Sequence, residues 1–245
     1  MDSRVRIRAI PAPTDAVFPQ AGGGFIGVLM LDTRFPRLPG DIGHAGAFGG
    51  AVRHRVVPGA VPRSVVTSAQ ALRESGLGRP FIEEARALAG QGARAITTSC
   101  GFLVLLQDEL QAAVPVPVVT SSLLQLQGLL AHESQLGVLT ISAERLGEDH
   151  LLAAGVPRER LADVIVQGVD PEGPFARAIL GNEPSMDVEG ATRDVVQAAL
   201  ALRRRAPHLR TAVLECTNMP PHAQAASEAS GLRLLSLFDD RRLRP

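Results

Sequence analysis

Short apolar runs alternate with amphipathic segments along most of this chain. Residues 25–31 form a continuous apolar run, which is typical of a strand buried on both faces of a parallel sheet. Further strands are predicted at 51–57, 64–66, 94–98, 116–120, 136–140, 161–166, 211–214 and 232–236. Helices are predicted at 81–89, 102–113, 142–154, 175–180, 188–205 and 223–229, and from Ser121 or Ser122 to residue 131.

This alternation of strands and helices predicts an α/β fold with mainly parallel sheets. A chain of 245 residues suggests either one large domain or two lobes of about 100–120 residues each. Five glycines between Gly40 and Gly50 indicate a flexible or closely packed loop. The sequence leaves open whether this loop acts as a lid.

Composition and charge exclude several classes of protein. The chain has no Lys, so a Schiff base to pyridoxal phosphate and a standard P-loop are both excluded. The formal net charge is zero, and Trp and Tyr are absent. Neither nucleic acid nor an anionic membrane is therefore an expected partner. The expected partner is a small molecule, and the number of chains in the assembly, including a homo-oligomer, is left open.

The two cysteines and the N-terminal residues bear on the compartment. Two cysteines in 245 residues do not make a disulfide framework. Residues 1–19 contain charges and prolines but no apolar core of a secretory signal. No run reaches the roughly 18 apolar residues of a membrane helix. We expect a cytoplasmic protein with reduced thiols.

Cys100 and Cys216 each follow a predicted strand and are each flanked by hydroxyl residues, in Thr98-Ser99-Cys100 and Cys216-Thr217. Ligands bind beyond the carboxyl ends of strands in open α/β sheets. A helix N-terminus beside a thiol stabilises the thiolate. Free cysteines are also common as small buried hydrophobes, but two in matching contexts favour a shared substrate site.

Other motifs are less informative. The spacing of Gly22 to Gly27 matches G-x-G-x-x-G, but the dinucleotide motif needs a strand before it and a helix after it. Here proline-rich coil precedes and a strand follows. No G-x-S-x-G nucleophile elbow and no zinc-ligand pair is present. We therefore expect no dinucleotide cofactor and no metal.

The first predicted strand ends in Asp32-Thr33. Asp32 is either a loop-capping residue or a group that orients a thiol or binds a substrate ammonium. Arg34 and Arg37 follow, and either one could bind a substrate carboxylate or be solvated.

Taken in order, Asp32-Thr33, Thr98-Ser99-Cys100 and Cys216-Thr217 resemble the aspartate/glutamate/hydantoin racemase superfamily. The resemblance covers most of residues 25–236. It implies two pseudo-symmetric α/β lobes, each a mainly parallel sheet flanked by helices, with the active site in the cleft between them. We assign 1–118 plus 224–245 to the first lobe and 119–223 to the second. The resemblance implies a cofactor-independent enzyme.

The resemblance further implies a racemase or epimerase that inverts the stereocentre α to a carboxylate or carbonyl of a small amino acid or related acid. One thiol removes the proton and the other delivers one on the opposite face, so the pair titrates as a unit. Hydroxyl and amide donors would stabilise the enolate-like intermediate. The predicted catalytic residues are Cys100 and Cys216, and the predicted substrate-binding residues are Asp32, Thr33, Thr98, Ser99, Gly101, Ser121, Thr140, Thr217 and Asn218.

Two departures from the superfamily pattern bear on the substrate. Gly101-Phe102 stands where amino-acid racemases have Asn-Thr, and Asn218 stands where they often have His. Alternatives are therefore a maleate-isomerase-like or decarboxylase-like enzyme that uses a cysteine, or a non-catalytic small-molecule binding protein. Arylmalonate decarboxylases keep only the later cysteine, so Cys100 counts against that branch.

Overall fold

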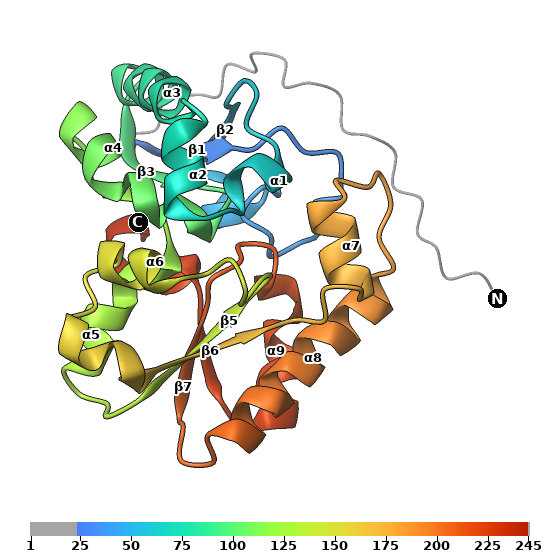
Figure 1. The fold of residues 1–245 in the computed structure, drawn as a ribbon. Coiled ribbons are helices and arrows are strands. Elements are labelled where there is room, and N and C mark those ends of the chain that lie inside the picture. The colour runs from blue at the N-terminus through green and yellow to red at the C-terminus, as the bar shows by residue number, and fades with distance from the viewer. Residues whose placement is uncertain (1–23, 245) are drawn as a thin grey trace.

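The computed structural model describes residues 24–244, which form two four-stranded parallel sheets (Figure 1). The first sheet contains β1 (Phe25–Met30), β2 (Val52–Val56), β3 (Ala93–Thr98) and β4 (Val118–Val119), in the order β2-β1-β3-β4. The second contains β5 (Leu136–Thr140), β6 (Val164–Gly168), β7 (Thr211–Leu214) and β8 (Arg233–Leu235), in the order β6-β5-β7-β8. The two orders correspond strand for strand, which confirms the predicted two-lobe α/β fold.

Helices flank both sheets (Figure 1). In the first half they are α1 (Pro62–Val65), α2 (Ala69–Glu74), α3 (Gly78–Gly90) and α4 (Gln107–Ala113). In the second half they are α5 (Leu126–Leu130), α6 (Glu148–Ala153), α7 (Pro174–Leu180), α8 (Val188–Arg205) and α9 (Ala223–Ser230). Short 3-10 turns join them, of which η2 (Gly101–Leu106), η3 (Ser122–Gln125), η4 (Arg158–Asp163) and η5 (Pro220–His222) matter below.

The core is formed by the apolar strands and the inner faces of these helices. All residues of β5 and β7 are buried, as are five of the six in β1, as expected for parallel strands covered on both faces. Helix α8 is amphipathic: Asp187 caps its first turn by accepting a hydrogen bond from the Gly190 N–H at 2.9 Å. Its last turn carries Arg203, Arg204 and Arg205, where positive charge complements the helix dipole.

Two predicted elements are wrong. Residues 64–66 lie in and directly after helix α1, not in a strand, because Pro62 opens a helical turn and the Ser64 hydroxyl accepts a hydrogen bond from the Val61 N–H. The helix predicted from Ser142 begins only at Glu148. Gly147 precedes it in extended conformation, and the acidic first turn that follows suits a helix N-terminus.

The sheet pairing differs from the division predicted for the C-terminal residues. Strand β8 pairs with β7 in the second sheet, so residues 233–235 do not lie in the first lobe. The chain then returns to the first sheet, where Leu237 and Leu243 pack against Ile26 and Val28. The Arg94 guanidinium donates a hydrogen bond to the Leu243 carbonyl at 3.1 Å. The N-terminal residues 1–23 of the predicted first lobe lie outside the described residues.

Candidate active site

Cys100 and Cys216 occupy equivalent positions in the two halves. Cys100 follows β3 and opens the turn η2, and Cys216 follows β7 ahead of η5. In each sheet the strand order reverses beside this strand, between β1 and β3 and between β5 and β7. Crevices at such reversal points are the usual ligand sites of open α/β sheets. The sheet topology therefore puts both thiols where a ligand is expected.

Both thiols line one cavity between the lobes. Cys100 is 8% exposed and Cys216 is 6% exposed. The cavity is lined by Leu31, Thr33, Phe35, Pro62, Val66, Ser99, Cys100, Gly101, Ile141, Ile179, Glu215, Cys216 and Asn218. Its volume is about 20 Å³, room for little more than one water molecule. The lobes must therefore part for a substrate to enter.

The thiols are poorer acids than the sequence indicated. Burial, followed by the charge of Glu215, raises the pKa of Cys100 and of Cys216 above that of a free thiol. The backbone N–H of Phe102 opposes this at Cys100, and that of Asn218 does so at Cys216. The expected thiolate stabilisation by turn N–H groups is thus present but is outweighed by desolvation.

Glu215 is a cavity residue that the sequence analysis missed. Its side chain is buried, and Oε2 accepts a hydrogen bond from the Thr140 hydroxyl at 2.7 Å. Burial raises the pKa of Glu215 to about 7, although the Thr140 hydroxyl and the N–H groups of Ile141 and Phe102 oppose the shift. The available signal was a lone acidic residue between the apolar run 211–214 and Cys216.

A second missed residue, Asp41, connects the lobes beside Cys216. The Asn218 amide donates a hydrogen bond to Asp41 Oδ2 at 2.5 Å, and the Cys216 thiol donates one to Asn218 Oδ1 at 3.7 Å. Arg37 forms an ion pair with Asp41 Oδ1 at 3.0 Å and donates to the Thr33 hydroxyl at 2.7 Å. This chain of contacts orients Asn218 toward the sulfur of Cys216.

The predicted substrate-binding residues fall into two groups. Four of them line the cavity: Thr33, Ser99, Gly101 and Asn218. The remaining five, Asp32, Thr98, Ser121, Thr140 and Thr217, are absent from its described lining. Their roles as substrate ligands remain predictions, and the hydrogen bonds of four of these five residues hold the surrounding backbone or Glu215.

The three threonines of the second group have structural partners. The Thr98 hydroxyl donates to the Thr120 carbonyl at 2.7 Å, and the Thr140 hydroxyl donates to Glu215. The Thr217 hydroxyl donates to the Ser99 carbonyl at 2.7 Å and so ties the second lobe to the first. These side chains support the cavity wall.

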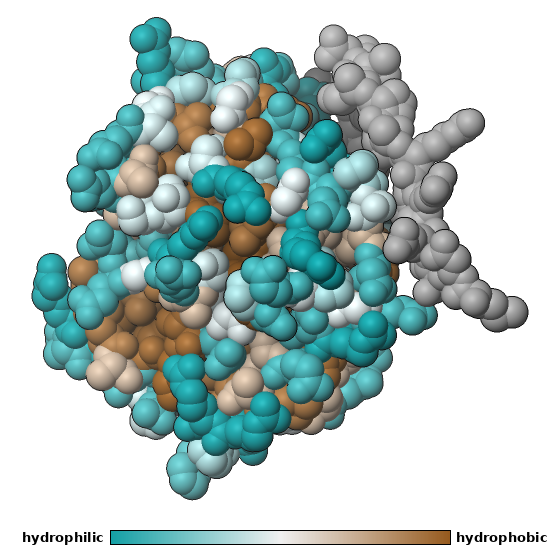
Figure 2. All heavy atoms as spheres, turned by 45° about the vertical axis from the view of Figure 1, so that its right-hand side comes forward, coloured by the Kyte–Doolittle hydropathy of each residue, from teal (hydrophilic) through white to brown (hydrophobic). Residues whose placement is uncertain are grey.

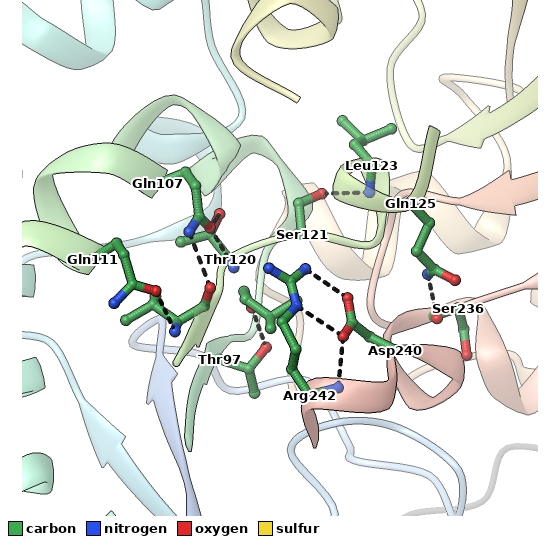
Figure 3. Close-up of polar contacts among 12 residues, drawn as sticks. Thr97, Gln107, Gln111, Thr120, Ser121, Leu123, Gln125, Ser236, Asp240 and Arg242 are labelled. Atoms are coloured by element: carbon green, nitrogen blue, oxygen red, sulfur yellow. Dashed lines mark hydrogen bonds and ion pairs between the residues drawn. The ribbon is translucent and has the colours of Figure 1, made fainter. Parts of the chain in front are cut away.

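Ser121 and Asp32 are the other two predicted ligands that are absent from the cavity lining. Figure 3 shows the Ser121 hydroxyl accepting the Leu123 N–H, at 3.2 Å, as the cap of η3. Asp32 has an exposed side chain, and its carbonyl accepts a hydrogen bond from the Asn182 amide at 3.2 Å. Of the two arginines after it, Arg34 is exposed and Arg37 belongs to the Asp41 network.

His222, the histidine nearest to Cys216 in sequence, is buried beside Phe175. Its Nδ1 bonds the Thr192 hydroxyl at 2.8 Å, and burial lowers its pKa to about 4. It does not line the cavity. Among residues 24–244, no three His, Cys, Asp or Glu side chains are grouped to hold a metal ion.

The face drawn in Figure 2 is mixed in hydropathy: hydrophilic residues are spread over it, with apolar areas between them. None of the helices in the described part of the chain is long and apolar enough to cross a bilayer.

The chain is similar in sequence to proteins named dimethylsulfoniopropionate lyases. The chain is 29% identical over 216 residues to a dimethylsulfoniopropionate lyase of Durusdinium sp. clade D, covering 84% of this chain and 69% of the relative. It is 31% identical over 233 residues to dimethylsulfoniopropionate lyase 7 of Emiliania huxleyi, covering 91% and 66%. Lyase 3 of that organism is 30% identical, covering 91% and 59%. No family model matches the chain.

Solved structures share the fold at low sequence identity. A glutamate racemase from Francisella tularensis superposes with a TM-score of 0.53 at 14% identity, covering 90% of this chain and 77% of that one. Unliganded arylmalonate decarboxylase gives a TM-score of 0.55 at 14% identity, covering 88% of both chains. A glutamate racemase isoform from Bacillus anthracis gives 0.54 at 15% identity, covering 90% and 79%.

Proposed function

Because the fold is that of the aspartate/glutamate racemase superfamily, we propose that this chain is an enzyme that removes the proton α to the carboxylate of a small acid. The observation that carries the proposal is the convergence of Cys100, Cys216 and Glu215 on one closed apolar cavity. The reaction we favour is a β-elimination that releases a leaving group from the neighbouring carbon.

The favoured substrate class is a propionate with a sulfonium group at the β carbon. The sequence relatives named dimethylsulfoniopropionate lyases support this class. A thiolate takes the α proton, the C–H electrons form the carbon–carbon double bond, and the carbon–sulfur bond breaks with its electrons going to sulfur. The products are acrylate, neutral dimethyl sulfide and the reprotonated thiol.

The cavity suits such a step. A desolvated thiolate with a raised pKa is a stronger base than a free one, and an α carbon needs a strong base. The negative charge that develops on the substrate carboxylate would meet the N–H groups of Phe102 and Asn218, which already face the two sulfurs. The apolar walls formed by Phe35, Ile141 and Ile179 exclude water from the reacting carbon.

A second candidate is the racemase or epimerase reaction. The equivalent placement of the two thiols at the ends of β3 and β7 favours it, because stereoinversion needs an acid–base group on each face of one carbon. Both reactions begin with the same proton transfer. They differ in whether the carbanion loses a β substituent or regains a proton.

The test is a product assay with purified protein. Dimethylsulfoniopropionate is incubated in heavy water, dimethyl sulfide is measured in the headspace, and acrylate is measured by NMR. A panel of chiral amino and hydroxy acids is followed for loss of optical rotation and for α deuterium. We expect acrylate and dimethyl sulfide in equal amounts. Stereoinversion without elimination would favour the second candidate. No turnover of either the sulfonium compound or the chiral acids would contradict the proposal.

The cysteine variants provide the mechanistic control. We predict that at least one of Cys100→Ala and Cys216→Ala lowers kcat by about 100-fold or more, the usual contribution of an acid–base group, because the elimination needs one thiolate base, whereas stereoinversion needs both thiols. Gly128→Ala, on the exposed side of α5, serves as the matched variant and should retain wild-type turnover.

A further inference from the structure

The cavity contains a carboxyl group that the proposed reaction has not yet used. Glu215 is 1% exposed and directly precedes Cys216. Its Oε1 has no hydrogen-bond partner within the usual distance and angle limits, although the N–H groups of Ile141 and Phe102 lie close enough to lower the pKa of the carboxyl. Within residues 24–244, no arginine or histidine forms an ion pair with it. A buried carboxyl without an ion-pair partner and with one weakly bonded oxygen is costly to keep in a folded protein.

The correspondence between the two sheets shows that the residue before the cysteine need not carry a carboxyl group. Ser99 is the equivalent residue of the first lobe: its N–H bonds the Leu29 carbonyl at 3.0 Å, and its hydroxyl accepts the Leu31 N–H at 2.9 Å. The Glu215 N–H bonds the Leu139 carbonyl at 2.8 Å in the same way. A serine completes the strand end in the first lobe, so backbone geometry does not explain the longer acidic side chain.

Space for this carboxyl is kept by Gly101. A Cβ placed on Gly101 would lie 2.5 Å from Glu215 Oε1. Gly101 directly follows Cys100, so Oε1 of Glu215 lies beside the turn that holds the other thiol. The Phe102 N–H lowers the pKa of both Cys100 and Glu215. The sulfur and the carboxyl therefore lie around one backbone donor.

Glu215 also acts on both sulfurs. Its negative charge raises the pKa of Cys100 and that of Cys216. Among the described residues that line the cavity, the ionisable side chains are these two thiols and Glu215. Two other charged groups lie in the loop that follows β1. Asp41 raises the pKa of Cys216, and Arg37 lowers the pKa of Cys100.

We propose that Glu215 is the proton-exchanging carboxyl of this site, which accepts the thiol proton so that the sulfur can act as the base. The inference rests on the proposed function and names a residue for its first step. The carboxylate takes the S–H proton, and the resulting thiolate takes the α proton of the substrate. The thiol is thereby restored, and Glu215 releases its proton to water when the lobes open.

The sulfonium group of the substrate helps this transfer. A cation in the cavity favours the negatively charged form of a nearby thiol. The pKa of Glu215, raised to about 7, allows the carboxyl both to take up and to release a proton near neutral pH. Proton removal from the thiol is therefore coupled to binding of a cationic substrate.

The test compares wild type with Glu215→Gln, which keeps the size of the side chain and an oxygen for the Thr140 hydroxyl. We expect kcat to fall by about 100-fold or more, with KM changing much less, and the acid limb of the kcat profile near pH 7 to disappear. Alkylation of the two thiols by iodoacetamide at pH 8, followed by mass spectrometry, should become faster, because the negative charge beside them is gone.

Thr140→Val supplies a second variant. It removes the hydroxyl that donates to the carboxylate, so the acid limb of the kcat profile should move to higher pH. Circular dichroism verifies that both variants are folded.

Two results would overturn the inference. One is an unchanged kcat with an unchanged acid limb in Glu215→Gln. The other is a rise in KM alone, which would assign Glu215 to recognition of the substrate's charge. Alkylation needs no substrate and separates this inference from the proposed function. If wild type turns over nothing, an unchanged alkylation rate in Glu215→Gln still overturns the inference, because a carboxyl close enough to take the thiol proton must change the pKa of that thiol.

Discussion

Gly101 lacks a side chain where the first lobe meets Glu215 of the second lobe. A Cβ there would meet the carbonyl oxygen and the carboxylate of Glu215, both on the opposite lobe. Glycine is needed at this position for close approach and not for its backbone angle. Amino-acid racemases have Asn at the position of Gly101. In this chain Glu215 fills the space that a side chain at position 101 would need.

Gly101→Ala should therefore lower both stability and turnover. Because the added methyl group contacts backbone and a buried carboxyl, we expect a loss of about 1–3 kcal/mol in the free energy of unfolding. Urea unfolding monitored by circular dichroism measures it. Gly128→Ala is the control: its Cβ meets nothing within 4 Å, so that variant should be as stable as wild type or up to about 1 kcal/mol more stable. Equal stability of both variants would contradict this account of Gly101.

Glu215 should also leave a mark on the pH dependence of stability. Its pKa rises from 4.5 in the unfolded chain to about 7 in the folded protein. The folded state then binds more protons between these values, so its stability falls as pH rises through this window. We expect Glu215→Gln to gain about 3 kcal/mol relative to wild type between pH 4.5 and pH 8.

Urea unfolding of both proteins across this pH range provides the measurement. His222, with its pKa lowered to about 4, acts in the opposite direction, since folding becomes more favourable as pH rises from 4 to 6.5. That contribution is the same in both proteins and cancels in their difference. A difference that does not vary with pH would mean that Glu215 titrates normally in the folded state.

At the scale of elements, the loop after β1 is a structural part of the site. Ile42 and Asp41 are buried, and Asp41 bonds both Arg37 and Asn218. The first part of the Gly40–Gly50 segment is thus fixed against the second lobe. Beyond it, Gly49 and Gly50 have positive φ values and open space around them.

Asp41→Asn should destabilise the protein. The Arg37–Asp41 pair is almost fully buried, and removing one partner leaves a buried charge without its counterion. We expect a loss of about 3 kcal/mol in the free energy of unfolding, together with lower turnover because Asn218 loses its anchor. Glu83→Gln, at the exposed pair with Arg79, is the matched control and should change stability by less than about 1 kcal/mol. Similar losses in the two variants would contradict the role of Asp41.

Elements with strong local signals were predictable from the sequence. Helix α8 and strands β5 and β7 have the predicted bounds, because their apolar periodicity is uninterrupted. The predicted start of the strand at Leu161 is wrong, because a 3-10 turn, η4, occupies residues 158–163 and β6 begins at Val164. Helix α2 was not predicted. Residues 64–66 were misassigned because their hydrophobicity suited a strand while Pro62 started a helix.

The candidate site was predictable only in part. Cys100 and Cys216 could be found because each ends a strand in a recognisable context. Glu215 and Asp41 could not be assigned, because their importance comes from contacts across the lobes: Asp41 is 177 residues from its partner Asn218. The direction of the thiol pKa shifts depends on burial and on Glu215, which local sequence does not show.

At the scale of the whole molecule, the lobes are closed over the thiols. The Thr217 hydroxyl of the second lobe bonds the Ser99 carbonyl of the first at 2.7 Å, and the Asn218 amide bonds the Asp41 carboxylate across the same junction. Arg145 reaches from the second half to the Val66 carbonyl at 3.0 Å. The cavity that remains has no room for a propionate, so turnover includes an opening of the lobes.

The native thiols should consequently react slowly. Burial and a raised pKa both reduce the fraction of accessible thiolate, and each pKa unit is a factor of ten in that fraction. We expect alkylation by iodoacetamide at pH 8 to be at least about 100-fold slower in the native protein than in urea. Saturating substrate should slow it further. Equally fast alkylation in both states would show that the thiols are open to solvent.

The central claim is that a cavity thiol takes the α proton of a small carboxylic acid. The direct measurement is the rate of acrylate release from dimethylsulfoniopropionate that carries deuterium at the α carbon, compared with the unlabelled compound. The account predicts a primary isotope effect on kcat/KM in wild type and loss of turnover in at least one of Cys100→Ala and Cys216→Ala. Product release that is insensitive to α deuterium, or that persists in both cysteine variants, would contradict it.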